Sequence, residues 1–275
     1  STKEQQEVGL LTPMVDRWRQ LGLSEMAIDD ILEGHRIPFR DGITPPYTGQ
    51  VSTQLQSDVE TCALTKELEG LLAKGVVEIV PPHLADEGYY SPYFLVQKKC
   101  GALRPILNLK AFNKFVARDK NKFKMLKVTT LLAMVQPGDW LSSIDLKDAF
   151  QHIPVAECHR KYFRFRFMGT CYQYTRLPFG YTLSPKTFSR CLKAALVVLL
   201  RKGIRLAWYL DDLLVMASTY EQAIQHTGEL MEYLEYVGFT INLKKSTPWP
   251  TRQTTFLGLL LDTEAGRATL SRERW

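Results

Sequence analysis

Apolar residues recur along this chain with two periods, and each period predicts a different kind of element. Short runs that alternate apolar and polar residues, or stay apolar between turn residues, predict strands. The predicted strands cover residues 76–80, 93–97, 103–107, 140–145, 162–167, 171–175, 239–243 and 256–261. Two further apolar arms flank a polar tip, Asp211-Asp212, within residues 206–217, which predicts a β-hairpin.

A helical spacing of apolar residues predicts three long helices. They cover residues 57–75, 184–203 and 219–238, and the last begins with a capping box at Thr219 and stops at a glycine. A shorter amphipathic stretch lies within residues 15–32. The third helix is expected to bury Ile224, Leu230, Met231 and Leu234.

The order of these elements predicts the fold class. From residue 140 the chain reads β-α-β-β-α-β in outline. We expect an α+β fold in which an antiparallel sheet carries its helices on one face and brings strands distant in the sequence together at its centre. Residues 1–54 are expected to form an N-terminal extension and a proline-rich linker.

Charge and cysteine content add few constraints. A net charge of +6 and a pI near 9.0 favour a polyanionic partner without proving one. Five cysteines without a C-x-x-C spacing disfavour both a disulfide framework and a zinc site. Two groups of basic residues are open to interpretation either as nucleic-acid contacts or as solvated surface: Lys120, Lys122, Lys124 and Lys127, and Arg160, Lys161, Arg164 and Arg166.

No targeting or membrane segment is visible in the sequence. No apolar run approaches the ~20 residues of a membrane span, and the N-terminus carries no signal peptide. We therefore expect an intracellular protein of the cytoplasm, the nucleus or both, which is not secreted and has no membrane partner.

Three carboxylates are the strongest candidates for chemistry. Asp211 and Asp212 interrupt the apolar run of residues 206–217, and Asp145 ends the strand that begins at Trp140. Carboxylates from two chain segments can hold two divalent cations about 3.5–4 Å apart, and Mg²⁺ suits such oxygen ligands. For the Asp211-Asp212 pair alone, a solvated turn is the alternative interpretation.

Ordered motifs over roughly residues 75–261 resemble those of reverse transcriptases. The motifs are Gln97-Lys98-Lys99 with Leu103-Arg104-Pro105, Asn108-Leu109-Lys110 to Asn113, Ser143 to Phe150, Tyr172-Gln173-Tyr174 to Leu177-Pro178-Phe179-Gly180 and Ser184-Pro185, Tyr209-Leu210-Asp211-Asp212, Leu243-Lys244-Lys245, and Phe256-Leu257-Gly258. Cys100 and Asn108 depart from the family pattern, since acidic residues are common at both positions.

Within that family, residues 34–39, 104–109 and 137–140 look most like the DIRS-type retrotransposons. These elements pair a reverse transcriptase with a tyrosine recombinase, and the long-terminal-repeat elements are the next closest group.

The resemblance implies a fingers-and-palm domain over residues 55–262. Fingers would cover about 55–136 and 158–180, and palm about 137–157 and 181–262. Residues 263–275 would begin a truncated thumb or connection, because the 14 residues after Leu261 are too few for the helical thumb of such enzymes.

The resemblance also implies roles for individual residues. Asp145, Asp211 and Asp212 would be the catalytic metal ligands, with Asp212 in a supporting role. The primer grip would be Phe256, Leu257 and Gly258. The nucleotide-binding residues would be Lys98, Lys99, Arg104, Asp148, Ala149, Phe150, Phe179, Gly180 and Lys245.

Four of these nucleotide-binding residues carry a specific chemical expectation. Lys98 or Lys99 would supply a point charge to the triphosphate, and Arg104 a bidentate fork. Phe150 resembles the bulky residue under the sugar that excludes a 2′-hydroxyl, although simple core packing is its alternative role.

We therefore expect an RNA-directed DNA polymerase, a nucleotidyltransferase that adds dNTPs to a primer 3′-OH in retrotransposon replication. Its cofactors would be two Mg²⁺ ions, with Mn²⁺ as a substitute. Its partners would be an RNA or DNA template-primer duplex, dNTPs, and flanking RNase H and recombinase domains of a parent polyprotein. Two alternatives stay open: an inactive or domesticated copy that acts as a nucleic-acid-binding or assembly module, and another palm-fold nucleotidyltransferase such as a cyclase.

Overall fold

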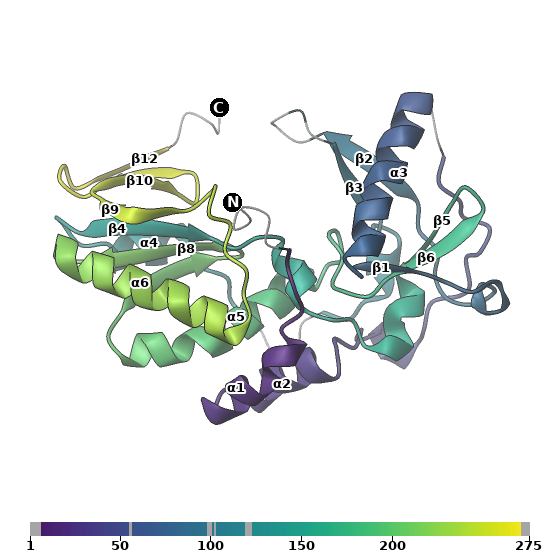
Figure 1. The fold of residues 1–275 in the computed structure, drawn as a ribbon, viewed down its shortest axis with the longest axis horizontal. Coiled ribbons are helices and arrows are strands. Elements are labelled where there is room, and N and C mark those ends of the chain that lie inside the picture. The colour runs from purple at the N-terminus through teal and green to yellow at the C-terminus, as the bar shows by residue number, and fades with distance from the viewer. Residues whose placement is uncertain (1–6, 55–56, 98–100, 102, 119–122, 271–275) are drawn as a thin grey trace. The chain divides into compact units, whose positions relative to one another are not determined.

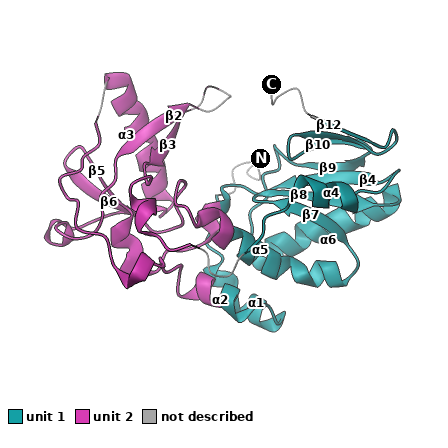
Figure 2. Ribbon diagram, turned by 180° about the vertical axis from the view of Figure 1, so that it is seen from behind, with its two compact units in different colours: residues 1–28, 123–149, 188–275 teal, residues 29–122, 150–187 magenta. Residues whose placement is uncertain are grey.

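The computed structural model describes residues 7–54, 57–97, 101, 103–118 and 123–270. Two compact units make up the chain (Figure 2): unit 1 takes residues 1–28, 123–149 and 188–275, and unit 2 takes residues 29–122 and 150–187. Both units combine helices with antiparallel strands, which confirms the expected α+β class. The boundaries assigned to fingers and palm from the sequence stay a prediction.

Helices and strands are interspersed along the chain. The helices are α1 (Val15–Gln20), α2 (Glu25–Leu32), α3 (Asp58–Ala73), α4 (Val128–Met134), α5 (Ser184–Arg201) and α6 (Tyr220–Val237). The strands are β1 (Val77–Ile79), β2 (Tyr93–Gln97), β3 (Leu103–Leu107), β4 (Trp140–Asp145), β5 (Arg164–Phe167), β6 (Thr170–Tyr174), β7 (Arg205–Tyr209), β8 (Asp212–Ala217), β9 (Thr247–Thr251), β10 (Gln253–Phe256), β11 (Leu259–Asp262) and β12 (Arg267–Leu270). Short 3₁₀-helices lie at Thr12–Met14, Arg40–Gly42, Pro82–Leu84, Phe112–Phe115, Ala149–His152 and Glu157–Tyr162.

Unit 1 is organised around a four-stranded antiparallel sheet in the order β7-β8-β4-β9. Helices α5 and α6 lie along one side of this sheet, and the smaller sheet β10-β11-β12 lies over the other (Figure 1). Successive side chains of a strand point to opposite faces. One face of the larger sheet therefore packs against the smaller sheet and α4, and the buried apolar side chains between them form a separate layer. Its residues are Leu131, Leu141, Ala207, Leu214, Met216, Phe256, Leu259 and Leu261.

The N-cap that the predicted capping box places at Thr219 is confirmed in α6. The Thr219 hydroxyl accepts a hydrogen bond from the Gln222 amide at 3.1 Å, and Gly238 ends the helix with a φ of 108°. The prediction that Ile224 is buried is wrong, because its side chain is 46% exposed. The buried stripe follows a strict four-three spacing one position away from it: Ala223, Thr227, Leu230, Leu234 and Val237.

Two predicted strands of unit 1 are wrong in detail. Residues 239–243 contribute only an isolated bridge between Ile241 and Leu146, and the strand beside β4 is β9 instead. Strand β9 was not predicted because it contains Pro248 and Pro250, and proline argues against a strand. Both prolines are tolerated because β9 is an edge strand.

The predicted strand at residues 256–261 is a hairpin. Strands β10 and β11 pair around the two-residue turn Leu257-Gly258, in which both residues have positive φ, 54° and 73°. That geometry is the one that two-residue hairpin turns prefer. The third strand, β12, falls within residues 263–275, whose assignment to the start of a thumb stays a prediction.

The N-terminal residues that the structure describes in unit 1 pack against the end of α6. Trp18 is fully buried, and its indole nitrogen donates to the Val237 carbonyl at 2.9 Å. The Arg17 guanidinium lies 4.4 Å from the centre of the Tyr236 ring. Helix α1 therefore forms part of the core of this unit.

Unit 2 contains the sheet β1-β6-β5, the hairpin β2-β3, and helix α3, which packs on both. Arg164 of β5, which the sequence left open as a nucleic-acid contact or as solvated surface, is buried, at 4% exposed. Its guanidinium donates to the carbonyls of Leu84 and Glu87 and to the Gln173 side chain. Arg164 therefore has a structural role, since buried cations need such partners.

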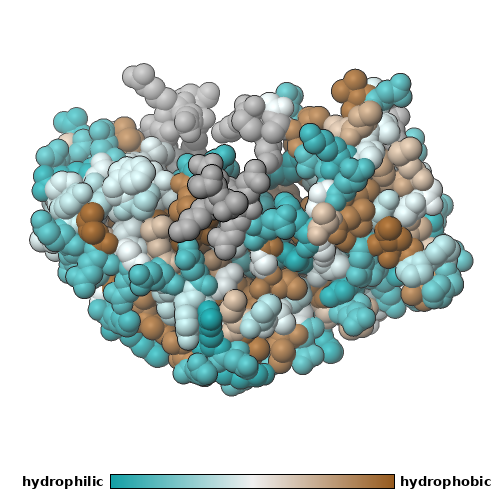
Figure 3. Space-filling model, in the orientation of Figure 1, coloured by the Kyte–Doolittle hydropathy of each residue, from teal (hydrophilic) through white to brown (hydrophobic). Residues whose placement is uncertain are grey.

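No helix among the described residues is long and apolar enough to cross a membrane. The molecular face drawn in Figure 3 mixes hydrophilic residues with small groups of hydrophobic ones.

An ion pair between the buried Asp139 carboxylate and Arg205, whose side chain is 30% exposed, joins the start of β4 to β7. Asp139 is 1% exposed, and both of its carboxylate oxygens accept from the Arg205 guanidinium, one of them at 2.8 Å. The Gln136 amide also donates to this carboxylate at 2.8 Å. Such a pair is costly to break, because one partner then leaves a buried charge behind.

Replacing Arg205 by Gln should lower the free energy of unfolding by about 3 kcal/mol, since Asp139 would lose its counter-ion. Lys202→Gln is the matched control, because its pair with Glu229 is exposed and should contribute under ~1 kcal/mol. Urea titration of both variants would measure the difference. Equal effects of the two substitutions would contradict the claim that the buried charge of Asp139 needs Arg205 as its counter-ion.

Candidate active site

Three carboxylates meet where β4 ends and β8 begins. Asp145 is the last residue of β4 and pairs across the sheet with Asp212, the first residue of β8. The Leu146 amide donates to the Asp211 carbonyl at 2.8 Å, which fixes the turn against the same strand end. Carboxylate oxygens of Asp145, Asp211 and Asp212 lie within 4.8 Å of one another. The expectation that these residues converge is confirmed.

The hairpin that carries Asp211 and Asp212 turns one residue earlier than predicted. Tyr209 pairs with Asp212, so the two-residue turn is Leu210-Asp211 rather than Asp211-Asp212. Leu210 has a φ of 52°, which is unfavourable for a branched side chain. The sequence rule that places polar residues at a hairpin tip fails here, because Asp212 is needed in the strand opposite Asp145.

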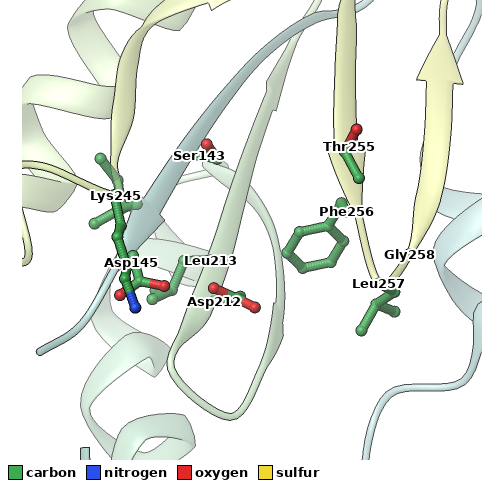
Figure 4. Close-up of a pocket in the computed structure, with 10 residues that line it drawn as sticks. Ser143, Asp145, Asp212, Leu213, Lys245, Thr255, Phe256, Leu257 and Gly258 are labelled. Carbon is green, nitrogen blue, oxygen red and sulfur yellow. The ribbon is translucent and has the colours of Figure 1, made fainter. Parts of the chain in front are cut away.

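The carboxylates perturb one another. Burial raises the pKa of Asp145 to about 8, and a hydrogen bond with Asp212 and the charges of Asp211 and Asp212 act in the same direction. The charge of Lys245 acts the other way on this pKa. Figure 4 shows the Lys245 amino group extending toward the Asp145 carboxylate. Crowding of the three carboxylates therefore favours a bound proton or a bound cation at this site.

A pocket of about 210 Å³ opens beside these carboxylates. It lies within unit 1, between the face of β4 and β8 that carries Asp145 and Asp212 and the turn of the β10–β11 hairpin (Figure 4). The residues that line it are Ser143, Ile144, Asp145, Asp212, Leu213, Lys245, Thr255, Phe256, Leu257 and Gly258. Lys245 and the three predicted primer-grip residues thus line the same pocket as Asp145 and Asp212.

Sequence patterns missed two residues that hold the end of β4. The Ser246 hydroxyl accepts from the Asp145 amide at 2.9 Å and donates to the Asn242 carbonyl at 2.7 Å. The Asn242 amide donates to the Asp145 carbonyl at 2.7 Å. Asn242 and Ser246 flank Lys244-Lys245, but nothing in a lone Asn or Ser signals this role.

A second group of predicted residues comes together in unit 2. The Arg104 guanidinium lies 5.1 Å from the centre of the Phe179 ring, and the Phe150 ring centre lies 6.0 Å from it. Phe179 is 51% exposed, although it is a large aromatic residue. Gly180 has a φ of 95°, and a β-carbon there would lie 3.3 Å from the Leu107 carbonyl oxygen.

The remaining predicted residues differ in how far the structure describes them. Lys98 and Lys99, together with the divergent Cys100, lie outside the described residues. Asp148 follows β4 with a positive φ of 41°, and Ala149 begins a 3₁₀-helix that includes Phe150. Their roles in nucleotide binding stay predictions.

A family model for "Reverse transcriptase (RNA-dependent DNA polymerase)" matches residues 96–261, which is more than half of the chain. The chain belongs to the reverse transcriptase family. The matched region spans the β4–β8 carboxylates, the Arg104–Phe179 group and the β10–β11 hairpin, so both groups of residues lie within the part of the chain that defines the family.

Similar proteins include the transposon Tf2-3 and Tf2-4 polyproteins of Schizosaccharomyces pombe. Each is 24% identical to this chain over 221 residues. The alignment covers 80% of this chain but 15% of each relative, so the chain spans a small part of the polyproteins that it matches.

The carboxylates fit a divalent metal by their chemistry. Reverse transcriptases use divalent metals, and the three side chains offer only hard oxygen donors. The raised pKa of Asp145 supplies a further reason, because crowded carboxylates are stabilised when a cation neutralises them. Asp145, Asp211 and Asp212 would hold such a metal.

The pKa of Asp145 predicts a pH effect on the metal-free protein. Its folded-state pKa of about 8 exceeds the ordinary value of 3.8, so the folded state binds the proton more tightly. Its contribution to stability is therefore complete below about pH 4 and is lost as the pH rises through about 8.

Asp145→Asn should remove this pH dependence, because an amide does not titrate. Denaturant unfolding of both proteins in chelator, between pH 4 and 9, should show the wild type losing stability relative to the variant as pH rises. A constant difference across this range would contradict the carboxylate crowding described above.

Proposed function

We propose that this chain is the RNA-directed DNA polymerase of a retrotransposon polyprotein. One observation carries the proposal: a member of the reverse transcriptase family retains three carboxylates whose oxygens lie within 4.8 Å, at the paired ends of β4 and β8. The substrates would be dNTPs and a primer annealed to an RNA or DNA template. Transposon polyproteins among its relatives support the retrotransposon setting.

The reaction would be transfer of a nucleotidyl group to a primer 3′-OH. Asp145 and Asp211 would hold two Mg²⁺ ions, with Asp212 beside them. When bound, such ions stabilise charge on the attacking and leaving oxygens. Lys245, whose charge already acts on Asp145, would also face the phosphates. Catalysis would rest mainly on positioning and electrostatics.

We also propose nucleotide-binding roles for three residues of unit 2. Arg104 offers a fork of donors suited to phosphate oxygens, and exposed Phe179 offers an apolar ring of the kind that packs on a base. Phe150, whose ring centre lies 6.0 Å from that of Phe179, would lie under the sugar and exclude a 2′-hydroxyl. Phe256, Leu257 and Gly258 would support the primer.

The subgroup of retrotransposon remains a separate proposal. The DIRS-type resemblance receives no support from the relatives, and the long-terminal-repeat alternative stands closer to them. The sequence of the parent reading frame would decide, since a tyrosine recombinase beside this domain is the mark of the DIRS type. Flanking RNase H and recombinase domains are part of the same proposal.

An inactive copy that only binds nucleic acid is the second candidate. Cys100 and Asn108 depart from the family pattern, which favours this candidate, whereas retained Asp145, Asp211 and Asp212 favour an active enzyme. Mg²⁺-dependent extension of a primed homopolymer template distinguishes the two.

Replacing Asp145 or Asp211 by Asn should lower primer extension by roughly a hundredfold or more, because a charge that acts on the reacting phosphate is lost. Asp212→Asn should be milder. Binding of primed template should change little, since most contacts would be made to its backbone. Asp16→Asn, at an exposed carboxylate, is the matched control. Near-normal extension by the Asp145 or Asp211 variant would refute the metal-site assignment.

Phe150→Val should weaken discrimination against ribonucleotides by roughly tenfold, because a smaller side chain opens space under the sugar. The measurement is the ratio of kcat/KM for dNTP and rNTP. Phe167→Val controls for core packing, since Phe167 is 4% exposed and lies in β5 of the same unit. If both variants kept the wild-type ratio, Phe150 would have only a packing role.

A further inference from the structure

A buried histidine near the N-terminus contacts the turn that presents Phe179. His35 is 4% exposed, and its Nε2 shares a hydrogen bond of 2.7 Å with the Tyr181 hydroxyl. The two rings also pack, with centres 5.4 Å apart. Tyr181 is 1% exposed and lies two residues after Phe179. A polar contact buried this deeply needs a structural or functional reason.

Backbone geometry fixes where His35 lies. Its amide donates to the Pro154 carbonyl at 2.8 Å, and its carbonyl accepts from the Ala156 amide at 2.9 Å. Gly34 makes this approach possible, because a β-carbon there would lie 2.5 Å from the Ala156 nitrogen. The His35 backbone therefore binds the residues on both sides of Val155, which places the imidazole beside the Tyr181 hydroxyl.

The turn that follows Phe179 is held from several directions. The Asn113 side chain donates to the Gly180 carbonyl at 2.9 Å and accepts from the Thr182 amide at 3.0 Å. The Ser184 hydroxyl donates to the Pro178 carbonyl at 2.7 Å. These contacts hold the backbone of the turn, and His35 holds the Tyr181 side chain. Phe179 lies in this turn with its side chain exposed, and Arg104 and Phe150 lie near its ring.

We propose that His35 is a positioning residue of the nucleotide-binding surface and acts through Tyr181 on the exposed ring of Phe179. This inference rests on the polymerase function proposed above. His35 itself does not touch the substrate. Its contribution is to restrict the turn at residues 178–184. Phe179 and Arg104 are then already ordered when a nucleotide binds, so binding does not carry the entropic cost of ordering them.

The test compares His35→Ala, His35→Gln and Tyr181→Phe in primer extension by the full chain. His35→Ala and Tyr181→Phe should raise the KM for dNTP roughly fivefold to tenfold, with kcat nearly unchanged, because a buried polar partner is lost. His35→Gln should restore most of the wild-type KM, since its terminal amide can reach the Tyr181 hydroxyl. The double variant of His35→Ala and Tyr181→Phe should be no worse than either single one.

His159→Ala is the matched control. His159 Nδ1 accepts from the Ile37 amide at 2.8 Å, so this variant loosens the same N-terminal segment without touching Tyr181. Its KM for dNTP should stay at the wild-type value. Hydrogen exchange of residues 178–184 should accelerate in His35→Ala and Tyr181→Phe but not in the His159 control.

Two failures can be told apart. A wild-type chain that neither extends primers nor binds dNTP refutes the proposed polymerase function and this inference with it. An active wild type whose KM and hydrogen exchange are unchanged by His35→Ala and Tyr181→Phe refutes this inference alone. A loss shared equally by His35→Ala, His35→Gln and His159→Ala would also refute it, because the effect would then be general loosening of the unit.

Discussion

The register between β4 and β8 is the constraint on which the candidate active site depends. Asp145 and Asp212 face each other because these two antiparallel strands pair residue by residue from Trp140–Ala217 to Asp145–Asp212. A slip of one residue would turn every side chain of a strand to the opposite face. Asp145 would then point toward the helices, and Leu141 would leave the apolar layer under β10 and β11. One register thus sets both the carboxylate cluster and the packing beneath it.

Unfavourable backbone conformations lie where the pocket is built. Leu210 and Leu257 both have positive φ, and both belong to two-residue turns, one carrying Asp211 and the other lining the pocket. Residues in such conformations persist only where the surroundings fix them. The Leu146 amide supplies part of that support for the first turn, since it donates to the Asp211 carbonyl. The same principle applies in unit 2, where Gly34 and Gly180 allow close backbone approaches that hold the surface around Phe179.

The sequence was sufficient for the fold class and for the three carboxylates, because both depend on strong patterns. Capping at Thr219, helical periodicity and the motif order all follow local rules. The errors arose where tertiary context outweighs those rules. Edge strand β9 contains two prolines, the β10–β11 turn has a leucine at positive φ, and the Asp211 hairpin places an apolar residue in its turn. Burial of Arg164 and the His35–Tyr181 contact depend on segments far apart in the sequence, which no local pattern reports.

The central claim is that the paired ends of β4 and β8 form a divalent-metal site. Affinity cleavage tests it directly: Fe²⁺ bound in place of the native metal, with ascorbate and peroxide, cuts the polypeptide beside the ion. The cuts should fall near Asp145, near Asp211 and Asp212, and near the Leu257-Gly258 turn that lines the same pocket. Excess Mg²⁺ should suppress them together, and Asp145→Asn should abolish them. Cuts elsewhere in the chain, or cuts at these positions that survive Asp145→Asn, would contradict the account.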